Sequence, residues 1–157
     1  VLEEWQGQYD GNLRIILPDT YGSETFFRNA PRWLAKWTGV RIDSGNPVRG
    51  AEIALDWWSK NGEDTSKKLL VFSDGLDVCA IEMLYKKFSK QARLSFGWGT
   101  MLTNDFIGLS EEPESSPISL VCKAVSVNGK PTVKISDDIG KILGRAEDLD
   151  RYMRVFN

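Results

Sequence analysis

Short runs of apolar residues, each ending in polar or glycine positions, recur through the first hundred residues of the chain. They predict four strands, at residues 13–19, 40–44, 68–74 and 92–96. The runs are apolar on both faces instead of alternating with polar residues, which is typical of parallel strands covered by helices.

The segments between these runs carry the spacing of amphipathic helices. One helix is predicted from Pro47 to about Asn61, with Asn46 as its N-cap and Gly62 just past its end. Its apolar positions recur at helical intervals and form one stripe that faces the sheet: Val48, Ala51, Leu55 and Trp58.

Further helices are predicted on both sides of this one. Ser23 is placed to cap the earlier helix, and Pro31 lies inside it, so we expect a kink or two short helices. Asp77 is placed to cap the later helix. The residues of the later helix expected to face inward are Ile81, Leu84, Tyr85 and Phe88. Residues 1–9 have the pattern of the tail of a helix.

This alternation of strand and helix predicts an α/β fold with right-handed crossovers and a largely parallel sheet. Four such units are too few to close an eightfold barrel, which takes roughly 250 residues. They could form a small open sheet or part of a larger, irregular (β/α) barrel. The polar turns described below favour part of a barrel, and the spacing alone leaves both arrangements open.

A different pattern follows the fourth strand. Residues 107–117 are acidic and rich in serine and proline, which predicts a solvated loop. Residues 118–127 and 132–136 are strand-like and are joined through Asn128 and Gly129, a pair that strongly indicates a hairpin turn.

A predicted helix from about Arg145 to Phe156 ends the chain. These patterns divide the chain into three parts. They are a partial α/β barrel that carries the ligand-binding turns (1–106), an acidic loop (107–117), and a small antiparallel β-hairpin subdomain with the C-terminal helix (118–157).

The 157 residues carry a formal net charge of −2 at pH 7, so we expect no binding to nucleic acid or to an anionic membrane. No apolar run reaches membrane-spanning length, and no signal peptide is recognisable. Cys79 and Cys122 lie far apart and suit unpaired thiols in a reducing compartment, so we expect a cytoplasmic protein. The chain has no histidine, which excludes histidine bases and a phosphohistidine on this chain.

Polar side chains follow the second predicted strand. Arg41 and Asp43 are two residues apart, so their side chains share one face of the strand. Ser44 and Gly45 then turn the chain into the next helix. An exposed ion pair is one interpretation of Arg41 and Asp43. The other is a ligand site, because a guanidinium at the end of an apolar strand can bind a carboxylate or phosphate through two parallel hydrogen bonds.

Two further turns have the composition expected where backbone N–H groups hold a phosphate: Ser73, Asp74 and Gly75 after the third strand, and Gly97, Gly99 and Thr100 after the fourth. Either turn alone also suits an ordinary tight turn, whereas both after neighbouring strands favour a phosphate site. Asp19, Asp43 and Asp74 would form a ring of carboxylates for sugar hydroxyls or Mg²⁺. Trp98, inside the glycine turn, could line a pocket.

Three motifs, VRIDSGNP, LLVFSDGLD and LSFGWGTMLTND, in this order and spacing, resemble the nicotinate phosphoribosyltransferase family. The flanking segments LPDTYGSETFF and NGKPTVKISDDIGK resemble the same family. The resemblance runs from about Leu13 to Lys141, and it covers only the C-terminal part of the family's enzymes.

The resemblance implies a type II phosphoribosyltransferase fold, an irregular α/β barrel with a second domain, acting as a homodimer. It implies that nicotinate and phosphoribosyl pyrophosphate give nicotinate mononucleotide and pyrophosphate in NAD biosynthesis, with ATP hydrolysis. Mg²⁺ would accompany phosphoribosyl pyrophosphate and ATP, and no tightly bound organic cofactor is implied. The ATP-linked histidine would belong to the N-terminal part of the enzyme, upstream of Val1.

The resemblance also assigns roles to individual residues. The catalytic residues would be Arg41, Asp43 and Asp74, and none would bind a metal. The substrate-binding residues would be Asp19, Ser44, Gly45, Ser73 and Gly75. The phosphate-binding residues would be Gly97, Gly99 and Thr100. The family usually carries a smaller residue at the position of Trp98.

Two alternatives stay open from the residues alone. One is another phosphate-binding (β/α) barrel enzyme, such as an aldolase or isomerase, although no well-placed Schiff-base lysine and no histidine base support it. The other is a non-catalytic module that binds sugar phosphates. The residues also do not distinguish nicotinate from nicotinamide as the substrate.

Overall fold

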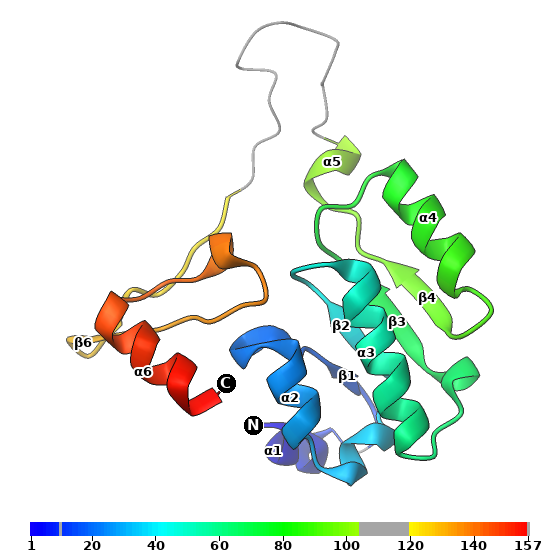
Figure 1. Ribbon diagram of the computed structural model, residues 1–157, viewed down its shortest axis with the longest axis horizontal. Coiled ribbons are helices and arrows are strands. Elements are labelled where there is room, and N and C mark those ends of the chain that lie inside the picture. Colours follow the sequence, from blue (N-terminus) through cyan, green and yellow to red (C-terminus); the bar gives the residue numbers. More distant parts are fainter. Residues whose placement is uncertain (10, 104–119, 157) are drawn as a thin grey trace, which may run out of the picture.

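The computed structural model describes residues 1–9, 11–103 and 120–156. A parallel sheet forms its centre, and each strand pairs with the next strand along the chain (Figure 1). In order across the sheet, the strands are β1 (Ile15–Ile16), β2 (Gly39–Ile42), β3 (Leu69–Phe72) and β4 (Arg93–Phe96). The predicted α/β fold with parallel strands is confirmed, and the carboxyl ends of all strands meet at one edge.

Three helices cover one face of the sheet (Figure 1): α2 (Ser23–Asn29), α3 (Pro47–Lys60) and α4 (Val78–Phe88). The predicted caps of α3 and α4 are confirmed. Asn46 Oδ1 accepts a hydrogen bond from the backbone N–H of Arg49 at 3.0 Å, and Asp77 Oδ1 accepts one from Ala80 at 2.7 Å. Each cap satisfies a backbone donor that has no partner inside its helix.

Shorter helical elements connect these units. They are α1 (Leu2–Gln8), α5 (Thr100–Thr103) and the 3₁₀ turns η1 (Asp19–Tyr21), η2 (Arg32–Lys36) and η3 (Thr65–Lys67). Ala30 and Pro31 separate α2 from η2, because proline cannot supply the N–H that would continue the helix. The expectation of two short helices is therefore confirmed.

The core lies between the sheet and the helices that cover it. The strand side chains that face the helices are buried: Ile16, Val40, Ile42, Leu70 and Phe72. They meet buried side chains of the covering elements, among them Trp37, Trp58, Leu84 and Phe88. Trp57 is buried as well, beside Trp58 on α3.

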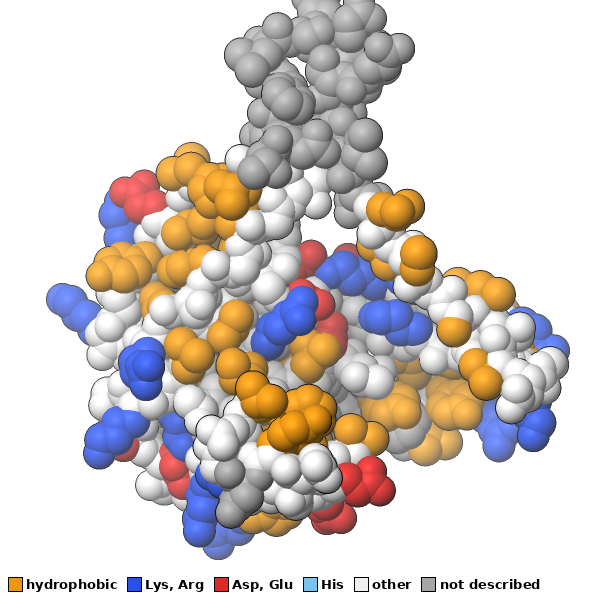
Figure 2. All heavy atoms as spheres, turned by 180° about the vertical axis from the view of Figure 1, so that it is seen from behind, with side chains coloured by type: hydrophobic (Ala, Val, Ile, Leu, Met, Phe, Trp, Pro, Cys, Tyr) orange, Lys and Arg blue, Asp and Glu red, His pale blue; other side chains and the backbone are white. Residues whose placement is uncertain are grey.

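The opposite face of the sheet has no such cover among the described residues. Ile15 keeps 44% of its surface exposed and Leu17 keeps 43%, although both belong to the first apolar run. Figure 2, seen from behind, shows hydrophobic side chains exposed on this side, next to a hollow where charged side chains of both signs gather. Within the described part of the chain, helices thus cover one face of the sheet and leave the other open.

The first strand is shorter than predicted. Only Ile15 and Ile16 pair with β2, instead of the whole run 13–19. Leu13 has a φ of 51°, which lies outside the extended region. At the other end, Pro18 lacks an N–H for the sheet, and η1 begins at Asp19.

Two side chains on the helices differ from prediction. Ser23 does not cap α2 with its own side chain; it is the first residue of the helix, and its partner is Asp137. Tyr85 was expected to face inward but is 58% exposed. It follows the fully buried Leu84 by one position, which rotates it away from the buried stripe of α4.

Residues 120–156, here named the C-terminal module, contain the predicted hairpin turn. β5 (Ser126–Val127) pairs antiparallel with β6 (Lys130–Pro131). Asn128 and Gly129 between them have φ values of 51° and 73°, as a tight hairpin requires. The antiparallel hairpin is therefore confirmed.

The pairing in this module is less extensive than predicted. Within the described residues, the run 118–127 is a strand only at Ser126–Val127, and the run 132–136 makes only an isolated bridge between Lys134 and Leu143. The module continues through η5 (Ile139–Lys141) and α6 (Ala146–Phe156), which confirms the C-terminal helix. The acidic loop predicted at 107–117 lies outside the described residues.

No helix in the described ranges is long and apolar enough to cross a membrane. Cys79 and Cys122 are exposed and unpaired, as their separation in the chain predicts.

Candidate functional site

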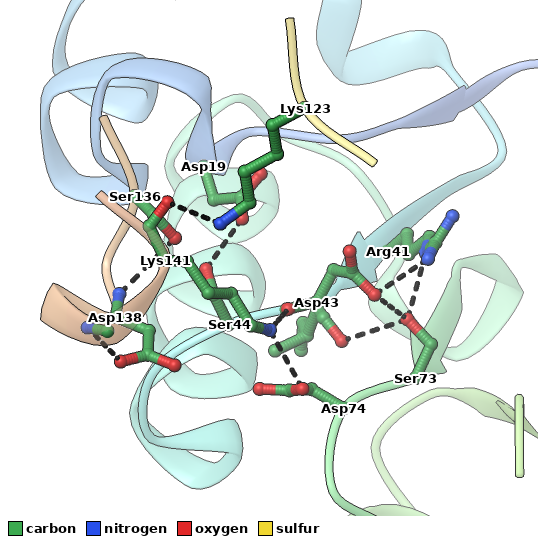
Figure 3. A network of polar contacts seen from close by, with 12 residues as sticks. Asp19, Arg41, Asp43, Ser44, Ser73, Asp74, Lys123, Ser136, Asp138 and Lys141 are labelled. Atoms are coloured by element: carbon green, nitrogen blue, oxygen red, sulfur yellow. Dashed lines mark hydrogen bonds and ion pairs between the residues drawn. The ribbon is translucent and has the colours of Figure 1, made fainter. Parts of the chain in front are cut away.

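A closed set of polar contacts joins the carboxyl ends of β2 and β3 (Figure 3). Arg41 Nε donates to Ser73 Oγ at 2.8 Å, and a terminal nitrogen of Arg41 lies 2.7 Å from Asp43 Oδ1. Ser73 Oγ donates to the same Asp43 oxygen at 2.7 Å. Ile42 is paired with Phe72 in the sheet, so the residues that follow them, Asp43 and Ser73, come side by side.

These contacts orient Arg41 and Asp43 and still leave part of each side chain for a ligand. Both contacts to Asp43 use Oδ1, so within the described chain Oδ2 remains available. An arginine has five N–H donors, and Asp43 and Ser73 engage only part of that set. The side chains of Arg41 and Asp43 are 46% and 30% exposed. A ligand can therefore reach a fixed guanidinium and a fixed carboxylate together.

Asp74, in the turn after β3, is held by a residue from the C-terminal module. Lys141 Nζ lies 2.8 Å from Asp74 Oδ1 and donates to the backbone carbonyl of Asp43 at 2.7 Å. One ammonium group thus joins the turns that follow β2 and β3. Figure 3 shows Lys141 reaching between Asp43 and Asp74.

Asp19 and Ser44 come together as a buried pair. Ser44 Oγ donates to Asp19 Oδ2 at 2.6 Å, and the two residues are 5% and 7% exposed, respectively. Both line a cavity of about 230 Å³ that also borders Asn46 and Arg49. The hydrogen bond fixes the turn after β2 against η1, so the direct effect of these residues in this structure is to shape the site.

The backbone of Gly45 packs closely against Asp137 of the C-terminal module. Its φ of 71° is a conformation that side chains rarely adopt, and a Cβ added there would lie 3.1 Å from Asp137 Cβ. Asp137 in turn accepts a hydrogen bond from the backbone N–H of Ser23 at 2.9 Å and another from the Ser23 hydroxyl. The start of α2 is therefore capped by a residue 114 positions away in the chain.

The third predicted turn lies beside the second. Gly97 N–H donates to the carbonyl of Phe72 at 2.7 Å, and a Cβ added to Gly97 would lie 3.2 Å from Ser73 Cβ. A Cβ on Gly99 would meet nothing within 4 Å, and Thr100 begins α5. Trp98 packs partly buried against the core, so its ring supports the turn.

The described residues contain no group of three or more Cys, Asp or Glu side chains that could hold a metal ion. Asp43 is paired with Arg41, and Asp74 is paired with Lys141. The Asp19 carboxylate is bound by Ser44. The carboxylates at the strand ends therefore do not assemble as the donor set of a resident Mg²⁺ ion.

The structure brings the predicted site residues to one edge of the sheet. Arg41, Asp43 and Ser73 form one network, Asp74 joins it through Lys141, and Gly97 lies against Ser73. Gly45 and Gly75 have positive φ values in their turns, a conformation that glycine adopts without strain. The roles assigned to these residues by resemblance stay predictions.

Two residues of the site escaped prediction from the sequence, Asp137 and Lys141. Both lie in the segment NGKPTVKISDDIGK, whose sequence indicates only a resemblance to the family. No spacing rule links this segment to the ends of β2 and β3 far earlier in the chain, since only tertiary packing brings them together. The one local signal is the pair of adjacent carboxylates at Asp137 and Asp138.

The whole chain, residues 1–157, matches the model of the "Nicotinate phosphoribosyltransferase (NAPRTase) family". Three solved structures resemble it closely. The nicotinate phosphoribosyltransferase from Vibrio cholerae is 35% identical with a TM-score of 0.88, and the one from Porphyromonas gingivalis is 32% identical with a TM-score of 0.83. A putative nicotinate phosphoribosyltransferase from Saccharomyces cerevisiae is 29% identical with a TM-score of 0.82.

Each of these matches covers 99% of this chain. The chain, however, spans only 38–40% of the length of those relatives. The match over the full sequence, together with the ordered turns at the carboxyl ends of β2, β3 and β4, leads to one conclusion. The chain belongs to the nicotinate phosphoribosyltransferase family.

Proposed function

We propose that this chain is the part of a nicotinate phosphoribosyltransferase that holds the sugar-phosphate end of the reaction. The reaction joins nicotinate to phosphoribosyl pyrophosphate and releases nicotinate mononucleotide and pyrophosphate, with ATP hydrolysis. The observation that carries the proposal is the contact of Arg41, Ser73 and Asp43 across two strand ends, in a chain that matches this family over its whole length.

The sheet supports a larger barrel as the setting of this site. Its strands follow the order of the chain, and α2, α3 and α4 lie on one face. In an open doubly wound sheet helices cover both faces, whereas in a (β/α) barrel they form only the outer ring. The uncovered face, with Ile15 and Leu17, would then be the inner face of the barrel.

The chemistry that this site would perform needs orientation and electrostatics more than a base. The pyridine nitrogen of nicotinate is itself the nucleophile and attacks C1′ of the ribose. The bond from C1′ to the pyrophosphate oxygen breaks, and its electron pair leaves with pyrophosphate. Positive charge develops at C1′, and the free oxygen of Asp43 and the carboxylate of Asp74 could stabilise it.

The remaining groups of the site have distinct tasks in this proposal. The Arg41 guanidinium would bind the carboxylate of nicotinate or an anionic oxygen of the sugar substrate. The backbone N–H groups around Gly97, Gly99 and Thr100 would hold the 5′-phosphate, since no side chain blocks approach to Gly99. Asp19 and Ser44 would keep the turn after β2 in place.

The family resemblance is the basis for including Mg²⁺, ATP and a second subunit in the proposal. The described residues do not form a resident Mg²⁺ site, so the ion would arrive bound to the substrate's pyrophosphate group. The chain has no histidine, so a phosphohistidine that couples ATP hydrolysis would have to come from another part of the enzyme. A homodimer is expected on the same resemblance.

A chimera tests the proposal directly. The segment of the Vibrio cholerae enzyme that this chain matches, 38% of that protein, would be replaced by this chain. We expect the chimera to form nicotinate mononucleotide from nicotinate and phosphoribosyl pyrophosphate, and to do so faster with ATP. Arg41→Gln in the chimera should lower kcat/KM by about 100-fold. Arg93→Gln, on the exposed amino end of β4, is the matched control and should change little.

Titration of the chimera with nicotinate mononucleotide and with ribose 5-phosphate distinguishes the proposed enzyme from a non-catalytic module and from another phosphate-binding barrel enzyme. Binding of the mononucleotide without turnover would indicate a module that has lost the chemistry. Binding of ribose 5-phosphate alone, with no effect of nicotinate, would favour another phosphate-binding barrel enzyme and contradict the proposal.

A further inference from the structure

The segment Ser136–Lys141 connects the C-terminal module to the candidate site at several points. Lys141 reaches two strand-end turns, and Asp137 reaches α2 and Gly45. The residues that it contacts lie 67 to 114 positions earlier in the chain, and the segment belongs to none of the strand–helix units. Figure 3 shows it packed against the site from the side of the C-terminal module.

The Lys141 ammonium is placed to hold two groups in a fixed relation. It lies 2.8 Å from Asp74 Oδ1 and 2.7 Å from the backbone oxygen of Asp43. An ammonium has three N–H donors, so these contacts can be made at the same time. The Lys141 side chain is 32% exposed and that of Asp74 is 39% exposed, so the pair lies at the rim of the site and not in the core.

The backbone that carries Lys141 is itself fixed on both sides. Asp138 accepts a hydrogen bond from the N–H of Gly140 at 2.8 Å and so caps η5, the turn that contains Lys141. Lys123 Nζ donates to the carbonyl of Lys141 at 3.2 Å. Asp137 is anchored to Ser23. The position of the ammonium is therefore set by the module and not by a flexible loop end.

We propose that Lys141 is a positioning residue for the reaction: it fixes the carboxylate of Asp74 and the main chain of Asp43 relative to each other. This inference rests on the proposed function. Arg41 and Ser73 hold the Asp43 side chain from one direction, and Lys141 holds its main chain from another. Ser73 also links the two turns, through its hydrogen bond to Asp43, whereas Lys141 is the described residue whose side chain holds the Asp74 carboxylate itself.

A positioning residue is needed because Asp43 and Asp74 lie in two separate turns. They follow different strands, and a backbone hydrogen bond from the Ser73 N–H to the Ile42 carbonyl at 3.0 Å still joins them, but the side chain of Asp74 lies beyond it. Asp74 without Lys141 would be an exposed carboxylate free to change rotamer. Misplacement of a group that stabilises a developing charge by even 1 Å can lower a rate about 100-fold. The Lys141 ammonium, 2.8 Å from Asp74 Oδ1, orients that carboxylate.

The test is a double-mutant cycle in the chimera described above. Lys141→Met should lower kcat/KM for phosphoribosyl pyrophosphate by about 10- to 100-fold and leave the KM for nicotinate within about twofold. Lys141→Arg, which keeps the charge, should recover part of the loss. Because Lys141 acts through Asp74, the double variant Lys141→Met with Asp74→Asn should be no worse than Asp74→Asn alone. Lys130→Met, an exposed lysine of the hairpin, is the matched control.

Several results would overturn the inference. Additive losses in the double variant would show that Lys141 acts independently of Asp74. A fall in kcat with both KM values unchanged, accompanied by a lower melting temperature, would show that Lys141 only stabilises the fold.

Crystal structures of the chimera and of its Lys141→Met variant give a second readout that does not depend on turnover. We expect the Asp74 side chain to change rotamer in the variant. An unmoved Asp74 would overturn the inference. An inactive parent chimera in which Asp74 moves as expected would count against the proposed function and not against the role of Lys141.

Discussion

Single residues at the strand ends carry the candidate chemistry, and the effect of each depends on which atoms its neighbours occupy. Asp43 presents one oxygen to Arg41 and Ser73 and keeps the other for a ligand. Gly99 has open space where a side chain would begin, whereas Gly45 is pressed against Asp137. A substitution at Gly99 can therefore alter ligand binding with little strain, and one at Gly45 would strain the protein itself.

Gly99→Val tests the phosphate-binding turn. We expect the affinity of the chimera for nicotinate mononucleotide to fall at least about tenfold, because the side chain blocks close approach to the backbone N–H groups. The affinity for free nicotinate should stay within about twofold, since nicotinate carries no phosphate. Isothermal titration measures both, and Gly7→Val in α1, also in open space, is the control. Equal losses for both ligands would show that the turn is only structural.

At the scale of elements, the sheet is held at its amino end by a buried lysine. Lys68, directly before β3, is 6% exposed, and its Nζ donates to the carbonyls of Ala35 and Trp37 at 2.7 and 3.1 Å. It also pairs with Glu63 at 2.7 Å. These contacts fasten the end of η2 to the start of β3, at the opposite edge of the sheet from the candidate site. Stability and ligand chemistry are therefore separated along the strands, as is usual in parallel α/β folds.

Lys68→Met should destabilise the chain without altering the ligand contacts. Removing the ammonium leaves a partly buried Glu63 and two buried carbonyls without their partner, which costs about 3 kcal/mol. Urea unfolding of the chimera, followed by tryptophan fluorescence, measures the free energy of unfolding. Lys67→Met, whose side chain is 81% exposed, should change it by less than about 0.5 kcal/mol. A similar small change for Lys68→Met would contradict the structural role.

At the scale of the whole molecule, the described chain is a parallel sheet with helices on one face, and apolar side chains near β1 stay exposed. Leu13, Ile15 and Leu17 are 64%, 44% and 43% exposed, all next to β1 at one edge of the sheet. Each Å² of apolar surface left in water forfeits about 25 cal/mol. Surface of this kind at an open strand edge is what further strands or a partner would cover.

We therefore expect the purified chain by itself to lack turnover and to self-associate. Sedimentation velocity should show species larger than the 17.7 kDa monomer. Adding the part of the Vibrio cholerae enzyme that this chain does not match should reduce self-association and restore ATP-stimulated synthesis of nicotinate mononucleotide. We expect that part to pack against the edge near Leu13–Asp19. A stable monomer with full ATP-stimulated turnover on its own would refute this view.

Much of this structure follows from short stretches of sequence. The apolar runs predicted the four strands, and Asn46, Asp77 and Asn128-Gly129 predicted two helix starts and a hairpin turn. Such features depend on neighbours within a few residues, so a local pattern contains their cause. The motifs after β2, β3 and β4 also identified the family, and their common edge followed from the parallel strands.

Tertiary packing decided what no local pattern contains. The length of β1, the exposure of Tyr85 and the cap of α2 by Asp137 all depend on what lies across from them in space. The same holds for Lys141, which meets Asp43 across 98 residues of chain. The sequence by itself determined the elements and the turns that end them. Docking of the C-terminal module decided how those turns are held, because hydrogen bonds and ion pairs between distant segments form only when the whole chain is folded.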